Sequence, residues 1–225
     1  MLSRILSPWK TLTPLLRSKY EELLGGKFFT RDYRSLSQFS IGEYTYGFPR
    51  VLFPEPGCRL VIGRFCSIAR GVEVFLGGEH CTRWISTYPF HDVISGIEQS
   101  TDTVRSKGSV TIGSDVWVGR EAMILSGVEI GHGAVVGARS VVTKSIPPYA
   151  IYAGNPAQLV RFRFAPDQIE ALLEIQWWNW DICRVRGALP LLQSPDADGF
   201  IRKYRQAERS AGLLDETAGT DACAS

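Results

Sequence analysis

The stretch VTIGSDVWVGREAMILSGVEIGHGAVVGARSVVTKSIPPYAIY, residues 110–152, places an aliphatic residue at every sixth position. These aliphatic residues are Ile112, Val118, Ile124, Ile130, Val136 and Val142. Most of them are followed by glycine. A six-residue period matches neither the 3.6-residue period of an α-helix nor the two-residue period of a strand. It is typical of a stacked β-helix, in which each repeat forms one side of a coil.

The same frame occurs upstream and defines where the coil begins. It is clear at Ile62, Ile68 and Val74 and weaker at Ile41 and Gly47. Two segments interrupt it: the Pro/Gly-rich stretch 47–57, which indicates a loop, and a longer segment at 76–108. The sequence therefore predicts an all-β fold with a parallel β-helix over residues 41–152 and an inserted loop over 76–108. Cys66 lies at an inward, small position of the repeat and is expected to pack in the core.

The flanking regions are expected to cap the open ends of the coil. Residues 1–40 form an N-terminal arm or cap. The alternative for this arm is a peripheral membrane contact through apolar residues; those residues are Leu2, Ile5, Leu6 and Trp9. Pro8, Pro14 and the early basic residues argue against a transmembrane segment or a signal peptide.

A helical extension is expected over 153–210, followed by a disordered tail at 211–225. Pro166 opens a helix, and its apolar face consists of Ile169, Leu172, Leu173 and Ile175. A second helix is expected over Asp181–Leu189, ended by Pro190, and a third near Asp198–Arg209. Three tryptophans are expected to pack between this extension and the coil; they are Trp177, Trp178 and Trp180.

Composition excludes several classes of function. A net charge of +2 over 225 residues implies no general attraction to nucleic acid. The five cysteines are scattered without CxxC spacing, which argues against disulfides and a zinc site and favours a reduced, cytoplasmic setting. No metal is expected.

The loop that interrupts the repeat contains the residues best suited to catalysis. The segment FLGGEHCTRWISTYPFHD (75–92) is rich in aromatic residues and contains two of the three histidines, His80 and His91. A histidine takes up a proton near neutral pH. His80 follows a Gly-Gly pair where the coil opens and is the preferred base, whereas the alternative role for His91 is to anchor the loop. His132 lies at an outward corner of the repeat, where exposure to solvent is expected.

These motifs resemble the left-handed β-helix acyltransferases, and within them the xenobiotic-acetyltransferase branch of hexapeptide-type chloramphenicol and streptogramin acetyltransferases. The resemblance spans about residues 41–205. It rests on VIGRFCSIARGVEVFLGGEH (61–80), WISTYPFH (84–91), the long stretch 111–164, QWWNWDI (176–182) and ALPLL (188–192).

The resemblance implies a homotrimer with active sites in the clefts between coils and acetyl transfer from acetyl-CoA to a hydroxyl. His80 matches the family's general base, and a backbone N–H would stabilise the oxyanion. Trp117 would lie beside the pantetheine arm, Thr143 and Lys144 near the adenine and phosphates, and Gly119 and Ala138 would offer backbone contacts. Arg161 and Arg163 would neutralise phosphate charge.

One departure from the family concerns the acceptor. Drug-modifying members have a longer, aromatic-rich insertion where this chain has GFPRVLFPEPGCRL (47–60). This favours a sugar-type hydroxyl of a surface polysaccharide or nucleotide sugar as acceptor. The alternatives are an antibiotic O-acetyltransferase, an amino-sugar N-acetyltransferase and a non-catalytic β-helix scaffold. A zinc-dependent hydratase of the same fold would need three converging histidines, and no such spacing is present.

Overall fold

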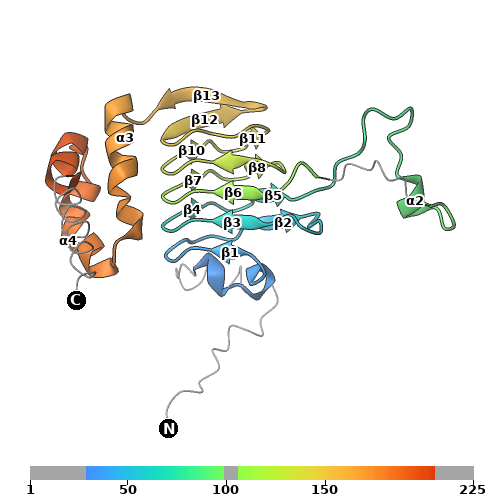
Figure 1. Cartoon of the computed structure of the whole chain (residues 1–225), viewed down its shortest axis with the longest axis horizontal. Coiled ribbons are helices and arrows are strands. Elements are labelled where there is room, and N and C mark those ends of the chain that lie inside the picture. The colour runs from blue at the N-terminus through green and yellow to red at the C-terminus, as the bar shows by residue number, and fades with distance from the viewer. Residues whose placement is uncertain (1–28, 99–105, 206–225) are drawn as a thin grey trace, which may run out of the picture. The chain divides into compact units, whose positions relative to one another are not determined.

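In the computed structural model the hexapeptide stretch winds into a coil with three β-sheets, in which the strands of successive turns pair in parallel (Figure 1). The structure describes residues 29–98 and 106–205. Each turn of the coil adds one strand to each sheet, as expected for the β-helix predicted from the repeat and for the left-handed β-helix that the resemblance implies. Short 3-10 helices at Thr30–Asp32 and Arg34–Leu36 precede the first strand.

The three sheets contain four, five and four strands, and are called here the first, second and third sheet. The first consists of β1 (Ser40–Ile41), β3 (Leu60–Ile62), β6 (Val110–Ile112) and β9 (Glu129–Ile130). The second consists of β4 (Ser67–Ile68), β7 (Trp117–Val118), β10 (Val135–Val136), β12 (Ala150–Gly154) and β13 (Ala157–Phe162). The third consists of β2 (Arg50–Leu52), β5 (Glu73–Phe75), β8 (Met123–Ile124) and β11 (Val141–Val142).

The repeated aliphatic residues form the core because equivalent positions of successive turns lie in register. Val74 pairs with Ile124, and Ile124 pairs with Val142, so one residue of each turn stacks on the next. All three are at most 1% exposed. A shift of one residue would turn this set outward, so burial fixes the register. Cys66 is fully buried in the same core, as predicted.

The Pro and Gly content of the stretch 47–57 predicted a loop, but part of this stretch forms a strand. It contains β2, whose residues Arg50, Val51 and Leu52 pair with β5. Pairing with a neighbouring turn overrides the local turn signal here, because Pro49 and Pro54 lie outside the strand and leave its N–H groups free to bond.

The helical region belongs to a second compact unit that begins at Phe162. It contains α3 (Pro166–Ile175) and α4 (Ile182–Leu192), with a 3-10 turn at Trp177–Asn179 between them and a further helix over 197–205. Pro190 lies inside α4 and does not end it, because the Gln193 N–H still donates to the Leu189 carbonyl. Trp178 and Trp180 are buried.

Several expectations concern residues outside the described ranges. Most of the N-terminal arm lies there, including its proposed membrane-contact residues, and so does the tail 211–225. Among the residues that the structure describes, no helix is both long enough and apolar enough to span a membrane.

Candidate active site

The insertion leaves the coil directly after β5, and Figure 1 shows its short helix α2 (Phe90–Val93) beyond the end of that strand. Its first residues form a turn. Gly78 has φ +83°, a conformation that favours glycine. A Cβ at Gly78 would also meet the ring of Phe53 at 2.6 Å. Glycine is therefore required two residues before His80.

His80 is exposed on this turn, and one of its ring nitrogens has a defined partner. Nδ1 lies 2.7 Å from the carbonyl oxygen of Thr87. A carbonyl oxygen can only accept, so Nδ1 must carry the hydrogen. In the neutral ring the lone pair is then on Nε2. The backbone at Thr87 thus selects the tautomer in which Nε2 can accept a proton.

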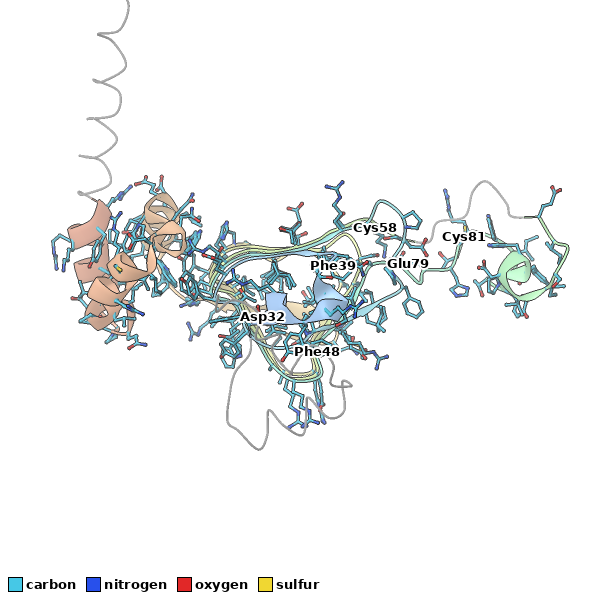
Figure 2. The ribbon with its side chains drawn as sticks, turned by 90° about the horizontal axis from the view of Figure 1, so that it is seen from below. Asp32, Phe39, Phe48, Cys58, Glu79 and Cys81 are labelled. Carbon is cyan, nitrogen blue, oxygen red and sulfur yellow. The ribbon has the colours of Figure 1, made fainter. Side chains whose placement is uncertain are left out.

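The base of the insertion is bonded to the coil on both sides. Glu79 contacts Ser126 and Lys107, which follow β8 and precede β6 respectively. On the returning side, Cys58 Sγ lies 3.3 Å from Ser106 Oγ. Figure 2 shows Cys58, Glu79 and Cys81 on the side of the coil from which the insertion leaves. These contacts fix the backbone from which His80 projects.

An aromatic residue that the sequence did not single out lies beside this turn. Phe53 is 54% exposed, has φ +49° and lies 6.0 Å from Phe75 between ring centroids. An exposed aromatic residue in a left-handed conformation is uncommon and marks a local constraint. The signal available in the sequence was its place in the interval that differs from the family.

The other two histidines have structural environments. His91 is half-buried on α2, with Nε2 3.3 Å from the Asp92 carboxylate. His132 is also half-buried, in contrast to the exposure expected at a corner of the repeat. Its Nδ1 accepts the Ser114 N–H at 2.8 Å across neighbouring turns, and burial lowers its pKa.

Four of the residues expected to bind CoA lie at two edges of the third sheet. Thr143 and Lys144 are exposed after β11, on the corner where His80 follows β5 two turns earlier. The structure thus places these residues along one edge. Gly119 and Ala138 follow β7 and β10, and therefore lie at the opposite edge of the same sheet.

Trp117 and Gly119 illustrate two different constraints. Trp117 points outward from the second sheet and is 56% exposed, as a ligand-contacting aromatic residue requires. At Gly119 a Cβ would lie 2.5 Å from the backbone nitrogen of Ala138. The coil itself therefore requires a glycine at position 119, independently of any ligand.

The two arginines differ in their surroundings. Arg161 is exposed on β13. Arg163 belongs to the helical unit, where its guanidinium carbon lies 5.2 Å from the centroid of the Phe164 ring.

The cysteine near the coil axis is unsuited to covalent catalysis. Burial raises the pKa of the Cys66 thiol to about 11, and Sγ lies 3.0 Å from the Gly113 carbonyl oxygen. The thiolate is the nucleophilic form, so Cys66 is inert at neutral pH. Over the described ranges, no group of three His, Cys, Asp or Glu side chains is placed to hold a metal ion.

The hexapeptide repeat and most of the chain have counterparts among known proteins. Residues 109–144 match the family model described as bacterial transferase hexapeptide (six repeats). The chain is 39% identical over 204 residues to a chloramphenicol acetyltransferase of Agrobacterium fabrum, covering 88% of this chain and 95% of that protein.

Two further relatives carry the names of other antibiotics. A probable macrolide acetyltransferase of Lysinibacillus sphaericus is 44% identical, covering 68% of this chain and 87% of that protein. A virginiamycin A acetyltransferase of Staphylococcus aureus is 40% identical, covering 72% of each. A sequence match of this extent, together with the three-sheet coil, identifies the chain as an acyltransferase that belongs to the hexapeptide-repeat acetyltransferases of the chloramphenicol and streptogramin branch.

Proposed function

We propose that this protein transfers an acetyl group from acetyl-CoA to a hydroxyl group of an antibiotic of the chloramphenicol or streptogramin type. The observation that carries the proposal is the His80 ring, whose Nδ1 is bonded to Thr87 and whose Nε2 is left as the basic atom. The names of the relatives support an antibiotic acceptor over the sugar-type acceptor expected from the sequence.

The proposed chemistry is direct transfer. Nε2 of His80 accepts the proton of the acceptor hydroxyl while the oxygen attacks the thioester carbonyl carbon. The tetrahedral adduct collapses as the C–S bond breaks, and the imidazolium returns its proton to the departing CoA sulfur. The products are the acetyl ester and CoA. Cys66 takes no part, because its thiol is buried and protonated.

Acetyl-CoA is proposed to bind with its thioester at His80 and its nucleotide end at cationic side chains. Lys144 and Thr143 are proposed to contact the nucleotide end, and Arg161 and Arg163 its phosphates. Trp117 would pack against the pantetheine arm. The exposure of Trp117 and Lys144 supports these roles, since both side chains are accessible to a ligand.

A homotrimer is part of the proposal. The insertion exposes a set of large apolar side chains, which in a monomer would face water. They are Ile85, Tyr88, Phe90, Val93, Ile94 and Ile97, each between 44% and 110% exposed. Burial of this set against a neighbouring coil would place His80 in a cleft between subunits. Sedimentation equilibrium tests it, with a trimer mass expected and a monomer mass overturning it.

The acceptor is tested by following CoA release with purified protein, acetyl-CoA and a panel of acceptors. The panel contains chloramphenicol, virginiamycin, a macrolide, nucleotide sugars, simple glycosides and amino sugars. We expect turnover of an antibiotic hydroxyl. Turnover of glycosides or nucleotide sugars alone would show that the acceptor is a sugar hydroxyl and not an antibiotic. Acetylation of an amino sugar at nitrogen would indicate an N-acetyltransferase. No turnover together with no acetyl-CoA binding by calorimetry would leave the scaffold interpretation.

A further inference from the structure

A single hydroxyl group joins the two ends of the insertion. Ser126 Oγ donates to Glu79 Oε1 at 2.8 Å and accepts the Lys107 backbone N–H at 3.1 Å. Lys107 Nζ in turn lies 3.3 Å from the same carboxylate oxygen. Glu79 is at the departing end of the insertion and Lys107 at its returning end, so the three residues form a closed bridge. We call it the Ser126 bridge.

The surroundings of the bridge make it stronger than a surface ion pair. Ser126 is 3% exposed and the Glu79 side chain 26% exposed, so water competes weakly for the hydrogen bond between them, whereas the Lys107 side chain is 63% exposed and its ion pair contributes little. A hydrogen bond to a carboxylate is charge-assisted and roughly twice as strong as a neutral one. The Gly127 N–H adds a bond of 3.0 Å to the Gly108 carbonyl on the returning side.

Glu79 is bonded directly to His80 along the chain, whereas the last strand before it, β5, ends at Phe75. A shift of the Glu79 backbone would therefore carry the imidazole with it. The Thr87 bond selects the tautomer of the ring, but Thr87 belongs to the same insertion and cannot fix its place against the coil. The contact between Glu79 and Ser126 supplies that fixed point, because Ser126 belongs to the coil.

We infer that Ser126 and Glu79 are positioning residues, which hold His80 against the coil for acetyl transfer. The inference rests on the proposed role of His80. A displacement of about 1 Å of a catalytic group costs on the order of a hundredfold in rate. Loss of the bridge is therefore expected to lower kcat by a larger factor than it raises the KM for acetyl-CoA, because neither Ser126 nor Glu79 is among the residues proposed to bind CoA.

The first test compares the kcat of Ser126→Ala, Ser126→Thr and Glu79→Ala, with the acceptor that the panel identifies. We expect Ser126→Ala and Glu79→Ala to lower kcat by about tenfold to a hundredfold and Ser126→Thr, which keeps the hydroxyl, to restore most of it. The matched control is Glu73→Ala: its side chain is 22% exposed and pairs with Arg50 at 3.5 Å but lies outside the bridge. It should keep the wild-type kcat.

Two combinations show whether the bridge acts through His80. The double variant Ser126→Ala/Glu79→Ala should lose no more than the larger single variant, because both remove one interaction. In a His80→Ala background, Ser126→Ala should cost nothing further. An equal loss in both backgrounds, or a wild-type kcat in Ser126→Ala, overturns the inference, whereas activity retained by His80→Ala alone overturns the proposed function.

A spectroscopic measurement tests the bridge without any acceptor. The chain has three histidines, so side-chain ¹⁵N spectra can report each ring separately. We expect His80 to keep the Nδ1–H tautomer in both proteins, because the Thr87 bond lies within the insertion, and its ¹⁵N signals to shift or broaden in Glu79→Ala, which is altered at a partly exposed site and should fold. An unchanged His80 spectrum in that variant would show that the bridge does not hold the ring.

Discussion

His80 Nδ1 and the carbonyl oxygen of Thr87 are 2.7 Å apart, and this contact joins the ring of the proposed general base to a residue seven positions along the same insertion. The acceptor is backbone, so no substitution at Thr87 removes it. The imidazole therefore keeps one tautomer as long as the insertion keeps its path. The role of the His80 ring can still be tested by replacing the His80 side chain.

Asparagine at position 80 tests the roles of the two ring nitrogens separately. His80→Asn keeps an N–H near the position of Nδ1 but has no counterpart of Nε2. We expect kcat to fall by about 10² to 10⁴, with the fold intact by circular dichroism. His91→Asn makes the same change in the same insertion and should leave kcat at the wild-type level. Equal kcat values for His80→Asn and His91→Asn would show that His80 is not the general base.

The regular coil was predictable because its signal is local, whereas the site depends on contacts between distant residues. A period of six identifies Ile112 to Val142 as inward positions without any knowledge of partners. The hydrogen bond between Glu79 and Ser126 joins residues 47 positions apart, and no pattern in either segment predicts it. The strand β2 was not predicted for a related reason. Its own sequence carries a turn signal, and pairing with the distant strand β5 makes it a strand.

The stacked core can be tested at two neighbouring residues of β8. Ile124 is fully buried between Val74 and Val142, while Met123 points outward and is 39% exposed. Ile124→Ala should lower the free energy of unfolding by about 2–5 kcal/mol, through lost burial and a cavity. Met123→Ala should change it by about 0.5 kcal/mol or less. Urea titrations of both variants measure the difference, and similar losses would contradict the predicted orientation of the strand.

Replacement of glycine by alanine is expected to have opposite effects on stability at two positions. Gly119→Ala would bring a methyl group to 2.5 Å from the Ala138 nitrogen, so the coil must shift. We expect a loss of about 1–3 kcal/mol. Gly187 lies inside α4, where an added Cβ would meet nothing within 4 Å, and Gly187→Ala should raise stability by about 0.5–1 kcal/mol. Thermal melts of the two variants should move in opposite directions.

Cysteine accessibility gives a prediction that depends on the pKa of Cys66. Burial raises that pKa to about 11, so the thiol stays protonated and unreactive at pH values well below it. Iodoacetamide at about pH 8 should label Cys183, which is exposed, and leave Cys66 unlabelled until the protein is unfolded. Peptide mass spectrometry measures both sites in one sample. Rapid labelling of native Cys66 would contradict the closed core.

His132 predicts how stability depends on pH. Burial holds its pKa below the ordinary value of 6.5, and its Nδ1 must stay unprotonated to accept the Ser114 N–H. The unfolded chain therefore binds a proton at a higher pH than the folded chain does. The contribution of His132 is complete above pH 6.5 and is lost as the pH falls from there toward the folded pKa.

His132→Asn isolates this contribution, because the Asn side-chain oxygen can accept the same N–H and does not titrate. Urea unfolding of both proteins at about pH 7.5 and pH 5.5 gives four free energies. The wild type should lose more stability than His132→Asn between the two values, since only the wild type must protonate a buried ring acceptor. Equal losses would mean that protonation of His132 costs the folded state nothing, and hence that its Nδ1 does not accept the Ser114 N–H in solution.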